Sequence, residues 1–294
     1  MMINKHGSFY IRNGWPTKIL LAVRDNPRIF SPNSELQAVD EVGTGRVMIK
    51  ALRYWADVMG LTIEEKDPQG LICRETSLFR ELYDYDIYLQ DLGSLWLLHR
   101  ELARNNEKAT AWYWAFNEFD KLRFTKDDFT TAFYGYSVGQ GASYAKAAYG
   151  KEFDCFKNTY VGDGAFELMK IIEEDTIPFF APLNIIKIKE RNVYEKQKIH
   201  VADIPLDIAF YCILKDNEDI LGEHRQISID TILNEPKQIG KYFSLSHSTL
   251  MELLQMLENR GKLALINNFG NRHVEMDAQD TDMLLHDYFD RAGR

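Results

Sequence analysis

The segment from Gly43 to Gly60 places one kind of side chain on each side of a single helix. At about 100° per residue, an apolar stripe is formed by Met48, Leu52, Trp55 and Met59. The opposite stripe is formed by Arg46, Lys50, Arg53 and Asp57. The sequence predicts a tight turn with a capping hydroxyl at Gly43-Thr44-Gly45 and a C-terminal stop at Gly60. We therefore expect a helix that packs on a core along one side and presents cations along the other.

The neighbouring segments predict what this helix packs against. Pro16 suits the first turn of a helix, which indicates a helix over 16–26, and a second helix is expected over 33–42. After the glycine stop, 61–65 and 71–74 flank a turn that contains proline and glycine, so they are expected to form a hairpin. Three helices followed by a hairpin is the order of a winged helix-turn-helix.

Charge is distributed unevenly along the 294 residues. The net charge is −9, yet residues 1–60 hold 8 Lys and Arg against 5 Asp and Glu. Because local potential steers association, a basic end can approach phosphate although the rest of the chain is acidic. We assign residues 1–82 to a winged-helix domain that binds double-stranded DNA. Its expected DNA contacts are Arg12, Lys18, Arg46, Lys50 and Arg53. An ordinary solvated helix face is the alternative for these cations.

The sequence predicts neither a membrane span nor a cleavable signal. No stretch approaches the ~18 uncharged apolar residues that a membrane helix needs, and the N-terminus turns polar and charged at once. Cys73, Cys155 and Cys212 lie far apart and show no CxxC spacing, which argues against a zinc site or a disulfide framework. We therefore expect a soluble cytoplasmic protein with no membrane partner.

The rest of the chain predicts two further domains. Residues 83–200 are rich in aromatic residues and mostly helical by pattern, so we expect a helical middle domain whose aromatic clusters are core. Residues 201–294 repeat the winged-helix order and end in a hairpin over 263–267 and 272–276. The expected fold is mostly α with small β-hairpin wings, and has winged helix-turn-helix domains at both ends around a helical middle.

The long helix of this C-terminal domain, capped by Ser246, differs from its N-terminal counterpart. Its outer stripe has no cation and consists of Ser248, Glu252, Gln255 and Asn259. The domain therefore suits protein contacts as well as it suits DNA, although Arg272 on the hairpin is expected to contact DNA. A final helix over 280–291 is expected to pack on a partner subunit, which would make the protein a homodimer.

Four stretches resemble the family known as domain of unknown function 4007. Residues 6–18 (HGSFYIRNGWPTK) follow the family's GHxSF-xxR-x-GW-xxK opening, and residues 42–55 (VGTGRVMIKALRYW) resemble its LGVGKNMVxxIRYW helix. Residues 91–99 (DLGSLWLLH) look like its DPGTLWLLH, and residues 110–119 (TAWYWAFNEF) are close to its TAWYWFFNEF. Weaker matches extend the resemblance over essentially the whole chain. Where the family prefers Gly-Lys-Asn, this chain has Gly-Arg-Val at 45–47, which keeps a cation but removes an amide that could read a base.

This resemblance implies a function in bacterial defence. The family includes the DNA-nicking component of single-strand DNA phosphorothioation systems, which replace a non-bridging phosphate oxygen with sulfur and mark host DNA against phage. It implies a magnesium-dependent DNA nickase that works with other phosphorothioation-system proteins. Other relatives accompany phosphorothioation genes without an assigned chemistry. A non-catalytic DNA-binding adaptor or regulator therefore stays as the alternative, and a protein-interaction scaffold as the third hypothesis.

Magnesium-assisted cleavage requires oxygen ligands, usually two or more carboxylates. The sequence shows no nuclease signature that we can place and no GxxxxGK[ST] loop, so the candidates are acidic residues inside or beside the family-like blocks. The candidate metal ligands are Asp86, Asp91, Glu118, Asp154, Glu174 and Asp175. The candidate catalytic residues are Asp91, Glu118 and His99. Each carboxylate is alternatively a helix cap or a surface charge, and His99 is alternatively a hydrogen-bonded structural histidine.

Overall fold

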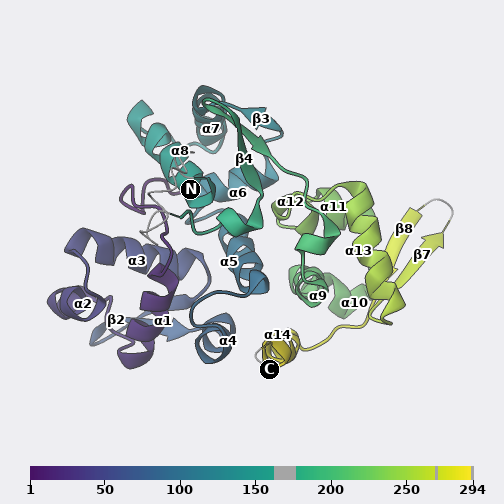
Figure 1. Cartoon of the computed structure of the whole chain (residues 1–294), viewed down its shortest axis with the longest axis horizontal. Helices are drawn as coiled ribbons and strands as arrows, with labels where there is room; N and C mark the ends of the chain where they lie inside the picture. The colour runs from purple at the N-terminus through teal and green to yellow at the C-terminus, as the bar shows by residue number, and fades with distance from the viewer. Residues whose placement is uncertain (162–176, 269–270, 293–294) are drawn as a thin grey trace.

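Helices make up most of the chain. The structure is a computed structural model that describes residues 1–161, 177–268 and 271–292, and within them the strands form three small antiparallel sheets. The N-terminal helices lie at one end of the long axis, and the hairpin of β7 (Ala264–Asn268) and β8 (Asn271–Glu275) lies at the other (Figure 1). The prediction of a mostly helical fold with small β-hairpins is therefore confirmed.

The N-terminal elements follow the predicted order. They are α1 (Trp15–Asp25), η1 (Pro32–Ser34), α2 (Glu35–Val42), α3 (Arg46–Val58), β1 (Thr62–Asp67) and β2 (Gly70–Glu75). Their bounds lie within two residues of the predicted ones. Leu52, Trp55 and Met59 are fully buried, and Trp55 Nε1 donates to the carbonyl of Phe9 at 3.0 Å. The apolar stripe of α3 thus forms the core that the sequence predicts.

The turn before α3 differs from its prediction in one respect. Gly43 adopts φ 66°, a left-handed conformation that ends α2, and its amide donates to the carbonyl of Val39. Thr44 does not cap α3, because the N-cap is Gly45 and no side chain bonds the first amides. The Thr44 hydroxyl instead lies 3.1 Å from Met48 Sδ. The first amides of α3 are therefore available to another partner.

The middle of the chain combines helices with a sheet that the sequence did not predict. Its elements are α4 (Ser77–Tyr85), α5 (Leu92–Arg104), α6 (Thr110–Asn117), β3 (Arg123–Phe124), α7 (Lys126–Gly139), α8 (Lys146–Tyr160), η4 (Ala181–Leu183), β4 (Ile186–Glu190), β5 (Val193–Lys196) and η5 (Val201–Asp203). The strands pair in the order β3-β5-β4, and they are too short for a clear two-residue period. The aromatic cluster is core, as predicted: Trp112, Trp114, Phe129, Phe133 and Phe156 are buried.

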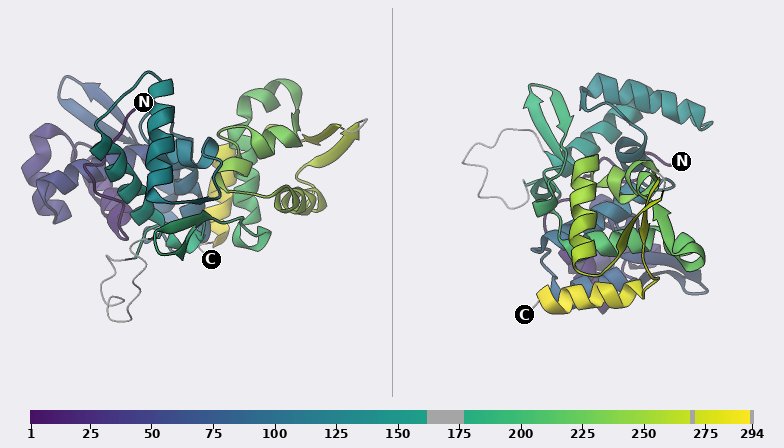
Figure 2. Two further views of the ribbon diagram at one scale, coloured as in Figure 1. Left: turned by 90° about the horizontal axis from the view of Figure 1, so that it is seen from above. Right: turned by 90° about the vertical axis from the view of Figure 1, so that its right-hand side faces the viewer.

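The C-terminal part is built around a second three-stranded sheet. Its elements before the hairpin are α9 (Leu206–Asp216), α10 (Glu218–His224), β6 (Gln226–Ser228), α11 (Ile229–Asn234), α12 (Ile239–Tyr242) and α13 (His247–Asn259), and α14 (Thr281–Ala292) follows it. The strand order is β6-β8-β7, so β8 pairs with both of its neighbours. The hairpin projects from the body of the molecule in the left view of Figure 2.

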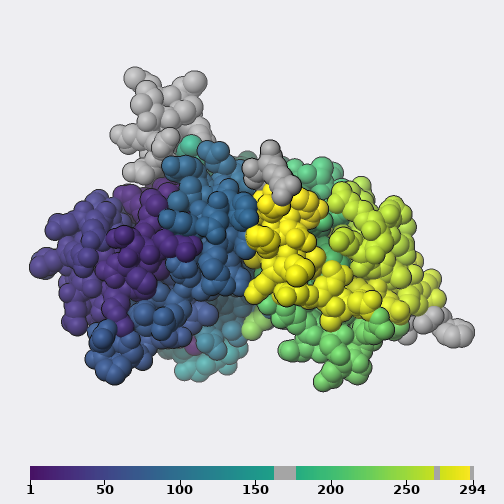
Figure 3. Space-filling view, turned by 90° about the horizontal axis from the view of Figure 1, so that it is seen from below, coloured from purple at the N-terminus to yellow at the C-terminus, as the bar shows by residue number. Residues whose placement is uncertain are grey.

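The final helix packs within its own chain. It contacts α9 and α4, and it lies between the N-terminal and C-terminal halves in Figure 3. Three side chains of α14 bond the N-terminal half: Asp282 accepts from Ser77 at 2.8 Å, His286 lies 3.2 Å from Glu81, and Tyr288 donates to Asp91 at 2.6 Å. The apolar side chains Leu285 and Phe289 of α14 are buried within this chain, so the predicted packing on a partner subunit is not needed to cover them.

Candidate nucleic-acid interface

The cations of α3 differ in how free they are to meet a ligand. Arg46, in the first turn, is exposed and has no hydrogen bond or ion pair within the described part of the chain. Lys50 has a side chain that is 76% exposed and a loose contact to Glu35 at 3.8 Å. Arg53 is half-buried and donates two hydrogen bonds to the Glu64 carboxylate, which raise the pKa of Arg53. The outer face of α3 is therefore cationic only over its N-terminal half.

The last member of the predicted outer stripe is also covered. Asp57 faces Lys108, whose Nζ donates to both carboxylate oxygens at 2.7 and 2.8 Å. This contact joins α3 to the segment between α5 and α6, so the C-terminal half of α3 packs against the middle of the molecule. The side of α3 that can approach DNA is thereby limited to its first two turns.

A pocket of about 500 Å³ lies beside the start of α3. Three segments line it: the start of α1, the turn before α3, and the loop between α4 and α5. The two predicted DNA contacts Arg12 and Lys18 both line this pocket, and so do Tyr88 and Gln90, which the sequence did not single out. Tyr88 and Gln90 were missed because they lie 76 and 78 residues from Arg12 along the chain and only the tertiary fold brings them together.

The two cations of the pocket are held by different contacts. The Arg12 guanidinium lies 5.7 Å from the ring centroids of both Tyr10 and Trp15, in cation–π geometry. Its Nε is buried and has no hydrogen-bond partner in the described part of the chain. Lys18 is exposed, and its Nζ donates to the carbonyl of Val42 at 3.2 Å, at the end of α2. Both charges stay close to the turn that starts α3.

The helix starts add to the positive potential of this region. The N-cap of α1 is Gly14 and that of α3 is Gly45, and neither helix has a side-chain cap. Helix N-termini carry a partial positive charge and unbonded amides, which favour anions such as phosphate. Arg12, Lys18 and the start of α1 thus lie together at the pocket, and Arg46 follows the Gly43-Thr44 turn that lines it.

The candidate carboxylates Asp86 and Asp91 lie together, where they shape the loop beside this pocket. Asp86 accepts hydrogen bonds from the amides of Gln90 and Asp91 at 2.8 and 3.0 Å and from Ser94 Oγ at 2.6 Å. Asp91 is the N-cap of α5 and accepts from the amides of Gly93 and Ser94 at 2.8 and 3.3 Å. These are the capping roles that the sequence left open as the alternative to metal binding.

His99 is enclosed in the core. Its Nε2 donates to the carbonyl of Tyr242 at 2.7 Å, which leaves Nδ1 to accept from the Tyr160 hydroxyl at 2.9 Å. Burial lowers the pKa of His99 to about 4. A neutral imidazole with both nitrogens engaged and no exposed surface has the environment of a structural histidine, the second of the two roles considered for it.

The other candidate carboxylates lie apart from Asp86 and Asp91. Glu118 is exposed rather than enclosed by the aromatic run before it, and it accepts from the Tyr113 hydroxyl at 3.3 Å. Asp154 pairs with Lys126 at 2.7 Å on the surface. Glu174 and Asp175 lie outside the described residues. Within the described ranges, no three His, Cys, Asp or Glu side chains are grouped as a metal site.

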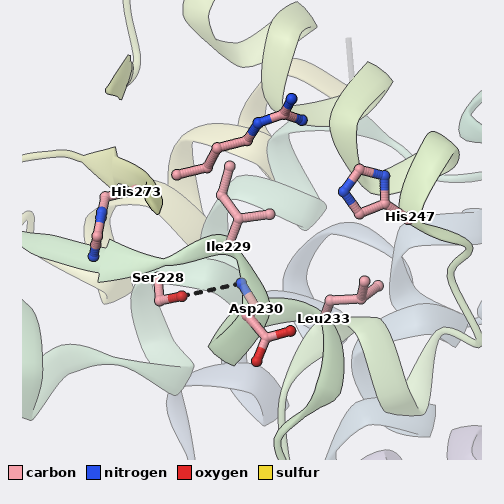
Figure 4. Close-up of a pocket in the computed structure, with 7 residues that line it drawn as sticks. Ser228, Ile229, Asp230, Leu233, His247 and His273 are labelled. Atoms are coloured by element: carbon pink, nitrogen blue, oxygen red, sulfur yellow. Dashed lines mark hydrogen bonds between the residues drawn. The ribbon is translucent and has the colours of Figure 1, made fainter. Parts of the chain in front are cut away.

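A second pocket, of about 610 Å³, lies at the C-terminal sheet and contains Arg272. His273 of β8 and His247 of α13 lie on opposite sides of it, with Ser228 and Asp230 from the β6–α11 junction between them (Figure 4). The sequence predicted Arg272, but it missed His247, because four separate elements form the pocket. Its mixed charge distinguishes it from the N-terminal pocket.

Comparisons with known proteins place the chain in one group. The family model described as "Protein of unknown function (DUF4007)" matches residues 3–290. Two crystal structures of SspB are similar, one of them with bound magnesium ion, at 25% sequence identity each and TM-scores of 0.81 and 0.80. Each alignment covers 99% of this chain and 87% of the other. No curated protein matches the chain. No helix in the described ranges is long and apolar enough to cross a membrane.

Proposed function

Since the chain belongs to the DUF4007 family, we propose that it acts on DNA as an SspB-like component of a phosphorothioation system. Two independent likenesses support this: the family match over nearly the whole chain and the fold shared with SspB. In this function the protein works in the cytoplasm with the other proteins of the system, in defence against phage.

One observation carries the DNA-binding part of the proposal. Arg46, exposed and unpaired in the described structure, stands at the uncapped start of α3, two residues after Thr44, which lines the pocket that holds Arg12 and Lys18. We assign α3 as the recognition helix and β1–β2 as the wing of a winged helix over 1–82. In such domains the first turns of the recognition helix approach base edges and phosphates.

The wing makes a smaller contribution to this interface. Arg74 of β2 pairs with Glu65 of β1, and Asp67 is held by Arg28 from the loop before η1. Lys66 is exposed and has no ion pair in the described part of the chain, so it is the one wing cation left for phosphate. Paired charges attract phosphate less than free ones do, so we place the main contact at the start of α3. We assign residues 83–200 to the helical middle domain and 201–294 to a second winged helix, whose Arg272 makes a subsidiary DNA contact.

For the chemistry we propose magnesium-dependent nicking first, supported by the likeness to magnesium-bound SspB. The described candidates do not fit a metal centre: Asp86 and Asp91 are committed to the loop and to the cap of α5, and no cluster of ligands forms. We therefore derive no step through the ion from these residues. The same observation favours a second candidate function, a non-catalytic adaptor that binds DNA and positions other enzymes.

A supercoiled plasmid separates these functions. Nicking converts it to open circles with magnesium, and a chelator stops the reaction. If supercoils persist across several divalent metals while the plasmid is still bound, the adaptor function holds. The Arg46→Gln/Lys50→Gln variant should lose binding, whereas Lys151→Gln, which removes an exposed cation of α8, should keep it. Absence of DNA binding by the wild type even at low salt would refute the proposal in favour of a protein scaffold.

A further inference from the structure

Tyr88 has an unusual position for an aromatic side chain. It is 71% exposed, more than any other large hydrophobic side chain in the described ranges, and it lines the pocket that holds Arg12 and Lys18. Scattered exposed apolar residues are common on protein surfaces. An exposed ring beside two cations, in a concave site, is instead an arrangement that binds a planar anionic ligand.

The loop that presents Tyr88 is tightly held. The Asp86 carboxylate accepts from the amides of Gln90 and Asp91 across the loop, and Thr17 Oγ1 of α1 donates to the carbonyl of Ile87 at 2.8 Å. Leu89, directly after Tyr88, adopts the left-handed φ of 54° and is 8% exposed. Bulky residues other than glycine rarely take this conformation. The anchored Leu89 side chain therefore leaves its neighbour Tyr88 pointing outward.

The groups that line the pocket match the parts of one nucleotide. The cations Arg12 and Lys18 and the uncapped start of α3 suit a phosphate. The Tyr88 ring offers a stacking surface for a base, and the exposed Gln90 amide can donate to or accept from a base edge. A volume of about 500 Å³ is typical of sites for single small molecules.

We propose that this pocket binds one unpaired nucleotide of DNA, with its base on Tyr88 and its phosphate toward Arg12 and Lys18. A base inside an intact duplex has both faces covered by its neighbours, so only a flipped or unpaired base can stack on a protein ring. The inference rests on the DNA-binding function proposed above and defines its substrate. The protein prefers DNA that carries an unpaired nucleotide over a fully paired duplex.

The test compares two DNAs and three variants. One duplex is fully paired, and the other carries a single bulged 2-aminopurine nucleotide, a base whose fluorescence falls when it stacks. Wild type should bind the bulged duplex more tightly and quench its fluorescence. Tyr88→Ala should weaken binding of the bulged duplex about 5- to 150-fold, the effect of removing one stacked aromatic. Tyr88→Phe keeps the ring and should retain both properties. Tyr134→Ala, which removes an exposed ring on α7, is the control.

The outcomes separate this inference from the proposed function. Equal binding of both duplexes, with neither affinity nor fluorescence changed by Tyr88→Ala, overturns the nucleotide pocket and leaves DNA binding intact. Failure of the wild type to bind either duplex at low salt refutes DNA binding itself. Because Tyr88 is largely exposed, its replacement should leave the folded structure unchanged, and a matching circular dichroism melt checks this.

Discussion

The guanidinium of Arg53 donates two hydrogen bonds to the carboxylate of Glu64, at 2.5 Å from Nε and 2.6 Å from Nη2. This pair fastens α3 to the first strand of its hairpin. It also removes from the outer face of α3 one of the three cations that the sequence placed there. The charge available to DNA is therefore set by Arg46 and Lys50, together with the pocket beside them.

The first prediction concerns the different roles of Arg46 and Arg53. Arg46→Gln should weaken DNA binding and lower the slope of log affinity against log salt by about 1, because one phosphate contact is lost. Arg53→Gln should leave the slope nearly unchanged, and it should lower the free energy of unfolding by about 0.2–1 kcal/mol. Fluorescence anisotropy across a salt series measures both slopes. Equal losses in the two variants would contradict the assignment of Arg53 to a structural pair.

The second prediction concerns the cap of α5. Asp91→Asn keeps a good N-cap and removes the charge, so stability should change little. Asp91→Ala removes the cap and should cost about 0.5–2 kcal/mol. Urea unfolding measures the difference. If the wild type nicks plasmid, Asp91→Asn should still do so, and an Asn variant that is fully stable but inactive would restore Asp91 as a ligand or catalytic group.

The third prediction follows from the buried imidazole of His99. Its pKa is lowered to about 4, below the ordinary value of 6.5, so the unfolded chain takes up a proton at a pH where the folded chain does not. This difference makes stability fall as the pH drops from about 6.5 toward 4. Between pH 7 and pH 5, the shifted pKa of His99 lowers the free energy of unfolding by about 2 kcal/mol. Unfolding midpoints at the two pH values measure it, and His99→Gln should show a smaller difference. An unchanged difference would place the titration elsewhere.

The fourth prediction concerns a buried ion pair between the middle and C-terminal parts. Arg100 Nε and Nη2 lie 2.9 and 2.5 Å from Asp216 Oδ1, and Tyr242 donates to Oδ2 at 2.5 Å. Asp216→Asn should lower the free energy of unfolding by about 3–5 kcal/mol, because it removes the buried carboxylate that Arg100 and Arg104 share and leaves Arg100 paired with Glu101 alone. The double variant Arg100→Met/Asp216→Leu should lose less than Asp216→Asn alone. A larger loss in the double variant would argue that packing, not charge, dominates there.

Local pattern was enough to predict the N-terminal elements. The apolar stripe that contains Leu52 and Trp55 repeats every three to four residues over the whole of α3, and a glycine lies at each end of this helix. The bounds of the helix and its buried side could therefore be predicted from the sequence alone. Short strands such as β3, with two residues, carry no such period. The sheet to which β3 belongs was therefore not predictable in this way.

Residue type along the chain also identified Arg12, Lys18 and Arg46 as candidate DNA contacts, and Asp86 and Asp91 as polar residues before a helix. Only the tertiary structure decided what these groups do. Glu64 neutralises Arg53 from another element, Tyr88 reaches the pocket from a loop 76 residues after Arg12, and His99 is closed off by Tyr160 and Tyr242. Helical period and capping depend on neighbours along the chain, whereas free charge, burial and pocket membership depend on contacts between distant segments.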